Sequence, residues 1–209
     1  MIDESVKFSF LCSHYKDTYD LHHDARKCRD SLFFGLLCIL CLFVMQFFSE
    51  ATELLDAYVT KQIGISLKDF DGFLSLLLWF MLMGWGIKYF QINVTIERQY
   101  DYLHALEKEI KTYYPPASLA YTREGVSYLR KYPLFSNWLH FLYTSVFPIF
   151  LIATCTIELF YEYWVEHRFW KVGVICYVMI TVSTILYMFR LHNSEPKFLL
   201  PLKKFLDTP

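Results

Sequence analysis

Residues able to bind a metal ion gather near the start of the chain. They are Cys12, His14, His22, His23, Asp24 and Cys28. Thiolate, imidazole and carboxylate groups are ligands that zinc takes in proteins. The spacing matches no compact metal-binding motif, and the adjacent His22 and His23 would point in different directions on a helix. We therefore expect no metal and no other cofactor, and keep a membrane metalloenzyme that uses these residues as an alternative.

Covalent catalysis has no signature in this sequence. No serine, cysteine or histidine constellation matches a catalytic motif, and no glycine-rich loop for phosphate is present. The basic residues of the polar segments are mixed with acidic ones, which does not indicate a nucleic-acid surface. We therefore predict a protein that is not an enzyme and does not bind nucleic acid directly.

Two ionisable residues, Lys88 and Glu158, fall inside long apolar stretches. A charge at the centre of a bilayer costs on the order of 3 kcal/mol on insertion scales. Both residues stand towards the ends of their stretches, so snorkelling of the charged group to the interface is the simpler interpretation. The alternative is that they line a pathway or face a neighbouring subunit.

Small hydroxyl residues and one proline mark the later apolar stretches. They include Pro148, Thr154, Thr181 and Ser183. Hydroxyls bond across packed membrane helices, and a proline kinks a helix, so helix packing is the favoured interpretation. A pore or gated channel that uses Pro148 as a hinge is the alternative.

Four apolar stretches must position these residues, at roughly 31 to 49, 72 to 93, 138 to 160 and 170 to 189. At 1.5 Å of rise per residue, each is long enough to cross the ~30 Å hydrocarbon layer of a bilayer as a helix. Hydrophobic residues make up 55% of the 209 residues, and the charges lie between the stretches. The sequence therefore predicts an all-α membrane protein with four transmembrane helices in contact with lipid.

The cationic residues predict the orientation. Of 20 Lys and Arg residues, 15 precede the first stretch, separate the second from the third, or follow the fourth. Four lie in the other two connections, and Lys88 lies within a stretch. Cationic loops stay on the cytoplasmic side, so we expect both termini in the cytoplasm of a cell whose inner membrane holds the protein.

Five segments follow from this plan. We expect a cytoplasmic arm over 1–30, of amphipathic or irregular structure, and a first pair of spans over 31–95 with an acidic outer connection. That connection places Leu54, Leu55, Tyr58 and Val59 at near-helical spacing, which predicts a short helix lying on the outer surface. A cytoplasmic helical hairpin over 96–137, a second pair of spans over 138–190 and a cytoplasmic tail over 191–209 complete the chain.

The hairpin carries an apolar stripe without an evident partner. One helix of about 40 residues is predicted from Gly72 to Tyr114, and a second over about 122 to 131, because the 3.6-residue periodicity continues beyond the second stretch. The stripe needs a covering surface in this chain or in another protein. The residues we expect at a partner contact are Tyr100, Leu103, Leu106, Ile110 and Tyr113, with Arg123, Arg130 and Lys131 at the rim.

A resemblance bears on the function. The run at 121–125 (YTREG), then Tyr128, Leu129 and the run at 132–135 (YPLF), are similar to sequences in small bacterial membrane proteins. The plan of four spans and cytoplasmic termini resembles the KwaA family, the membrane components of Kiwa phage-defence systems. The resemblance implies an inner-membrane oligomer that senses phage-induced membrane disturbance and leaves nucleic-acid binding to a soluble cytoplasmic partner. It supplies no catalytic residues.

Taken together, the residues favour a scaffold or sensor that assembles with copies of itself and with a soluble cytoplasmic protein. The soluble segments are too short to form an enzyme domain, and no relay of ionisable residues crosses the apolar stretches.

Overall fold

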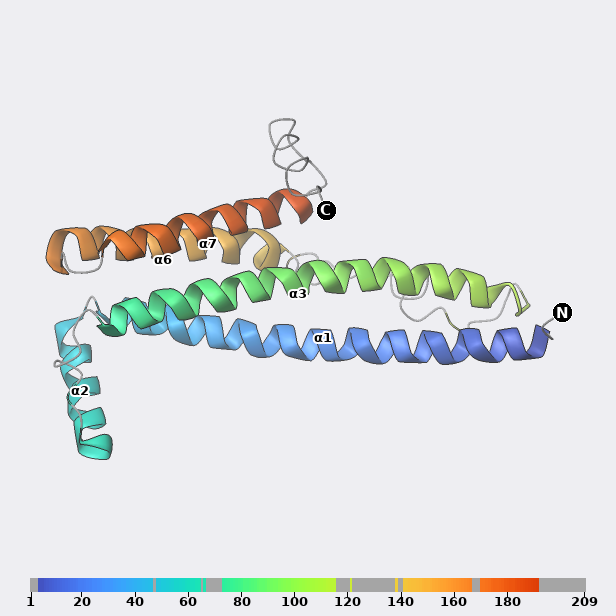
Figure 1. Cartoon of the computed structure of the whole chain (residues 1–209), viewed down its shortest axis with the longest axis horizontal. Coiled ribbons are helices and arrows are strands. Elements are labelled where there is room, and N and C mark those ends of the chain that lie inside the picture. Colours follow the sequence, from blue (N-terminus) through green and yellow to red (C-terminus); the bar gives the residue numbers. More distant parts are fainter. Residues whose placement is uncertain are drawn as a thin grey trace. The chain divides into compact units, whose positions relative to one another are not determined.

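The computed structural model describes residues 4–46, 48–64, 66, 73–115, 121, 138, 141–166 and 170–191. Within these ranges all regular structure is helical. The elements are α1 (Glu4–Gln46), α2 (Ser49–Ile63), α3 (Phe73–Lys111), η2 (Leu142–Val146), α6 (Phe147–Tyr161), η3 (Glu162–Glu166) and α7 (Trp170–Leu191) (Figure 1). The two η elements are short π-helical turns at the two ends of α6.

Four helical stretches are long and apolar enough to cross a membrane. They are Glu4–Gln46, Phe73–Lys111, Leu142–Trp164 and Trp170–Phe189. This confirms the prediction of an all-helical chain with four membrane-length apolar helices.

α1 corrects the expected boundary between the arm and the first span. The arm expected over 1–30 is helical rather than irregular and continues directly into the first apolar stretch, because one helix of 43 residues runs from Glu4 to Gln46. No glycine or proline precedes Gly35, so the polar half contains no residue that would break a helix. At 1.5 Å per residue the helix is about 64 Å long, twice what a bilayer requires.

α3 confirms the long second helix. Its 39 residues end at Lys111, and Thr112, Tyr113 and Tyr114 then donate backbone bonds to carbonyls three residues earlier. This tightening just before Pro115 is expected, because a proline disfavours helical geometry in the residue before it. The second helix predicted over 122–131 and the tail over 192–209 lie outside the described residues.

The chain divides into two compact units, and α1 and α3 each contribute one part to both. Unit 1 comprises residues 1–33 and 91–140, and unit 2 comprises 34–90 and 141–209.

In unit 1, α1 and α3 lie antiparallel. The rings of Phe8 and Tyr113 are 5.0 Å apart, and the Tyr15 hydroxyl donates to Oε1 of Glu107 at 3.0 Å. The covered residues recur at steps of three and four: Phe8, Leu11, Tyr15, Thr18, His22, Ala25 and Arg29 on α1, and Ile96, Tyr100, Leu103, Glu107, Ile110 and Tyr114 on α3. This average step of 3.5 residues is typical of helices paired along a coiled-coil seam.

In unit 2, four helices share an apolar interior. Buried residues come from every one of them: Leu36, Leu40 and Phe43 of α1, Leu78, Trp79 and Leu82 of α3, Leu151 and Cys155 of α6, and Cys176, Ile180 and Tyr187 of α7. Phe43 lies 5.3 Å from Trp79 between ring centroids, and Phe90 stacks on Tyr187 at 4.5 Å. The opposite faces expose large apolar residues such as Ile149, Ile157 and Ile175, as lipid-facing surfaces do.

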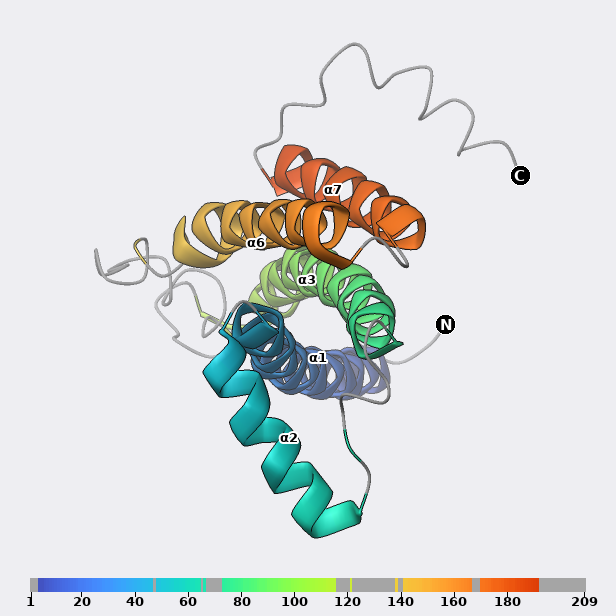
Figure 2. The ribbon, with the colours of Figure 1, turned by 90° about the vertical axis from the view of Figure 1, so that its left-hand side faces the viewer.

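α2 confirms the short helix predicted in the first outer connection, although nothing in the fold fixes the side of the membrane. It begins three residues after the last residue of α1 and runs across the direction of α1 rather than continuing it (Figures 1 and 2). It ends at Gly64, whose φ of 76° is in the left-handed region that glycine adopts freely, and whose N–H donates to the Thr60 carbonyl.

Candidate functional site

A buried carboxylate joins the helices of unit 2. Glu162, at the start of η3, is only 3% exposed. Its Oε1 accepts a hydrogen bond from Nε1 of Trp79 at 2.7 Å and a second one from the Ser75 hydroxyl. Both donors come from α3, one turn apart, so the carboxylate ties α3 to the end of the third span.

α7 completes this junction with a glycine. A Cβ atom at Gly173 would lie 2.5 Å from Oε2 of Glu162 and 3.3 Å from Nε1 of Trp79. A side chain here would therefore force the carboxylate to shift. We call Ser75, Trp79, Glu162 and Gly173 the glutamate junction.

Glu158 adds a second carboxyl group one turn before the junction. Its side chain is 0% exposed, so it does not snorkel to the interface, and that expectation is wrong. The reason is the face it occupies: Leu151, Cys155, Glu158 and Glu162 follow one another at steps of four, three and four, which is the buried stripe of this helix. Glu158 thus faces the interior of unit 2.

The sequence interpretation missed Glu162. The predicted third stretch ends near residue 160, which places Glu162 in the following connection, where more aromatic and acidic residues come after it. The available signal was the four-residue step from Glu158, which places both carboxyl groups on the same face of a continuing helix. Ionisable residues inside a membrane-spanning bundle can hold a proton or small cation, or bridge neighbouring helices.

Pro148 is buried near the start of α6 and follows a π-helical turn. In that turn the N–H of Phe147 donates to the carbonyl of Leu142, five residues earlier. A proline cannot donate to the carbonyl four residues before it, and the wider turn rearranges the backbone bonding at this point. The expected kink therefore takes the form of a local change of helix type.

The hydroxyl residues assigned to packing or a pore are Thr154 on α6 and Thr181 and Ser183 on α7, and the two on α7 point to different sides of that helix. Thr154 is buried and donates to the Phe150 carbonyl at 3.0 Å, and Ser183 donates to the Met179 carbonyl at 2.7 Å. Thr181 is half-buried and stands two residues from Ser183 on α7. At about 100° per residue, positions 181 and 183 are on nearly opposite sides of the helix, so the two side chains do not line one axis.

The stripe assigned to a partner contact lies within unit 1. Leu103 and Ile110 are 0% exposed and Leu106 is 5% exposed, covered by this chain itself. Tyr100 is half-buried beside His22, and Tyr113 stays 39% exposed beside Phe8. The rim residues Arg123, Arg130 and Lys131 lie outside the described residues. The sequence did not show whether this chain or another protein covers the stripe. In the structure, the part of α1 that belongs to unit 1 covers it.

Two further sequence predictions concern Lys88 and the candidate metal ligands near the start of the chain. Lys88 is exposed on α3, a position that suits snorkelling. Within the described ranges, no three His, Cys, Asp or Glu side chains converge as a metal site would require. His14 instead bonds the Tyr102 hydroxyl at 2.8 Å, and His22 is buried against Tyr100.

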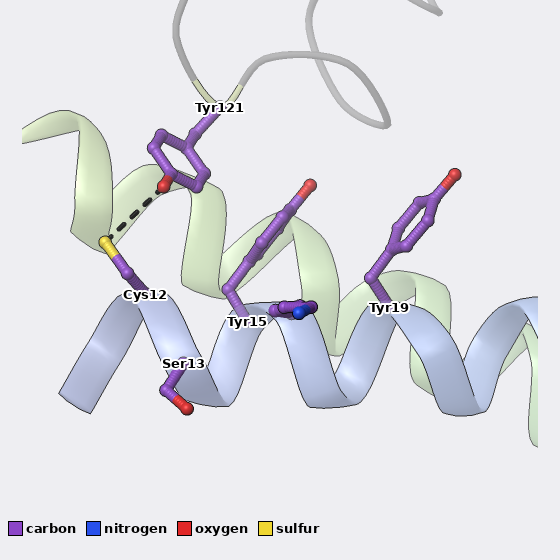
Figure 3. A pocket seen from close by; sticks show the side chains of 6 residues that line it. Cys12, Ser13, Tyr15, Tyr19 and Tyr121 are labelled. Carbon is purple, nitrogen blue, oxygen red and sulfur yellow. Dashed lines mark hydrogen bonds between the residues drawn. The ribbon is translucent and has the colours of Figure 1, made fainter. Parts of the chain in front are cut away.

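An aromatic hollow of about 470 Å³ opens on unit 1 (Figure 3). It is lined by Cys12, Ser13, Tyr15, Lys16, Tyr19 and Tyr121. The Tyr121 hydroxyl donates to Sγ of Cys12 at 3.5 Å, and this bond, with burial, raises the pKa of Tyr121 to about 12.

The described geometry thus offers two features for function, the glutamate junction in unit 2 and the paired helices of unit 1. The resemblance to the KwaA family stays a prediction from the sequence. Comparison of the chain with protein-family models, with curated proteins and with solved structures found no match.

Proposed function

We propose that this chain is a non-enzymatic scaffold or sensor of the bacterial inner membrane, which assembles with copies of itself and docks a soluble cytoplasmic protein. One observation carries the proposal. α1 and α3 each continue without a break from a membrane-length apolar half into a largely polar half that pairs with the other helix. A helix of this kind can transmit a change in the bilayer to a protein surface outside the bilayer. The resemblance to the KwaA family supports a setting in phage defence.

The partner contact belongs on the exposed face of unit 1, since Leu103, Leu106 and Ile110 are covered. Phe10 and Leu21 of α1 are 71% and 63% exposed and eleven residues apart, which places them on one face of the helix. His14 lies on the same face and bonds Tyr102 of α3, which is 48% exposed. We call Phe10, His14, Leu21 and Tyr102 the arm ridge. Arg123, Arg130 and Lys131, which lie outside the described residues, stay predicted from the sequence as the cationic rim of the partner contact.

Purification in mild detergent from the native host tests this proposal. The wild-type chain should retain a soluble protein, and Phe10→Asp with Leu21→Asp should lose it, because buried apolar anchors dominate such contacts. Ser5→Asp with Ser9→Asp is the matched control, since it adds the same charge at exposed positions on another face of α1. Equal retention by both double variants, or no retained protein with wild type, would contradict the proposal.

The buried carboxyl groups favour a second candidate, a gated cation pathway. Glu158 and Glu162 lie on one face of the third span and are 0% and 3% exposed. Liposomes that contain only this chain should then conduct cations, and Glu158→Gln should reduce the flux. Liposomes as tight as protein-free ones would eliminate this candidate while leaving the scaffold proposal intact.

A further inference from the structure

α2 presents an apolar face whose outer edge is left open by the part of the chain that the structure describes. Leu54 is 73% exposed and Tyr58, one helical turn later, is 64% exposed. Ala51, Leu55 and Val59 continue the apolar face and are half-buried. The opposite side carries Glu53, Asp56 and Thr60. The helix is therefore amphipathic, with the outer edge of its apolar face uncovered.

The position of α2 in unit 2 restricts what covers that edge. α1 ends at Gln46 and α2 begins at Ser49, while α3 enters its own membrane-length segment at Phe73. Both ends of the connection are thus held where spanning helices leave the hydrocarbon layer. Because α2 runs across the direction of α1 (Figures 1 and 2), it lies along the membrane surface when α1 crosses the membrane.

The ends of the membrane-length helices that flank α2 in the chain also expose apolar residues. Leu42 and Val44 are exposed near the end of α1, and Phe73 and Leu77 are exposed near the start of α3. On membrane-spanning helices, such side chains face hydrocarbon. Leu54 and Tyr58 therefore stand at the level where acyl chains meet headgroups, a depth that suits leucine and the amphipathic ring of tyrosine.

We propose that α2 is an interfacial helix whose Leu54 and Tyr58 insert into the lipid leaflet at which α1 ends and α3 begins. Its charges define the kind of surface. α2 carries three carboxylates, Glu50, Glu53 and Asp56, and one lysine, Lys61, so it has no cationic face with which to attract anionic headgroups. Burial of apolar area drives the insertion, which therefore does not require anionic lipid. The inference requires that α1 and α3 cross a bilayer, and it is independent of the soluble partner proposed above.

Spin-label accessibility in the full-length chain tests the insertion. Single nitroxide labels are placed at 54, 58 and, as a matched exposed control on the polar side, at 60. The background replaces Cys12, Cys28, Cys38 and Cys41 by alanine and retains the buried Cys155 and Cys176. The protein is reconstituted in liposomes of phosphatidylcholine alone, and in liposomes that also contain phosphatidylglycerol. Apolar oxygen and a water-soluble nickel chelate serve as relaxants, because they partition in opposite directions across the interface.

Labels at 54 and 58 should meet more oxygen than nickel chelate, and the label at 60 should show the reverse, in both lipid mixtures. Three results would overturn the proposal. Labels at 54 and 58 that behave like the label at 60 would place the face in water. Shielding from both relaxants would place it against protein, such as a second copy of the chain. Insertion only with phosphatidylglycerol would contradict an apolar driving force.

Discussion

At the residue scale, the glutamate junction depends on a missing side chain. Gly173→Ala would place Cβ against Oε2 of Glu162, so the carboxylate must shift, which perturbs its hydrogen bonds from Ser75 and Trp79. Gly84→Ala is the matched control, because a Cβ there meets nothing within 4 Å. Alanine favours a helix over glycine by up to about 1 kcal/mol, so the control should keep or raise the melting temperature. We expect Gly173→Ala to lower it in the same detergent, and equal melting temperatures would show that the junction tolerates the methyl group.

Unit 1 has its own buried polar contact, between Tyr15 and Glu107. Glu107 is 5% exposed, and Tyr15→Phe removes a hydroxyl that donates to it. Loss of a donor to a buried acceptor costs about 1–3 kcal/mol, so amide hydrogen exchange in the N-terminal half of α1 should become faster. Tyr102→Phe, which deletes the exposed bond to His14, is the control and should change exchange little. Similar acceleration by both variants would mean that burial of the Glu107 contact is unimportant.

At the element scale, a double substitution tests whether the stripe on α3 is the core of unit 1 or a docking surface. Leu103→Asp with Leu106→Asp puts two charges into the seam, and the paired helices of unit 1 should open while the spans stay inserted. Limited proteolysis should then cut the N-terminal half of α1 much faster. Tyr102→Asp with Ala105→Asp adds the same charge at exposed positions and should leave cleavage slow. If the seam variant resists the protease like wild type, the stripe is not the core of unit 1.

The sequence predicts elements of this fold better than it predicts their pairing. Apolar length identified four membrane-length helices, and the periodicity after the second one led to a helix that ends near Tyr114. The partner of the stripe was not readable, because Tyr15 and Glu107 are 92 residues apart and the covering face of α1 is mostly polar or aromatic. The absence of glycine and proline before Gly35 was the one signal for a continuous α1.

The candidate site was predicted only in part, because it too depends on contacts between residues far apart in the sequence. Glu158 was singled out because it interrupts an apolar stretch, whereas Glu162 stands among residues that resemble a loop. Its burial depends on Ser75 and Trp79, more than 80 residues earlier, and on Gly173 of the next helix. Contacts of this kind come from tertiary packing, which local patterns do not encode.

At the scale of the whole molecule, the sidedness of the membrane decides which surfaces can meet a cytoplasmic partner. The 15 cationic residues around unit 1 and the tail, against four in the two other connections, predict that unit 1 is cytoplasmic and α2 is on the outside. A single cysteine at Thr60, in the background without Cys12, Cys28, Cys38 and Cys41, should react with an impermeant maleimide added to cells whose outer membrane has been opened. A cysteine at Ser5, which is also exposed, should react only after the inner membrane is permeabilised. The reverse pattern would place the arm ridge outside the cell, where no cytoplasmic protein reaches it. The interfacial position of α2 would survive that result, because it depends on the ends of α1 and α3 and not on which leaflet receives them.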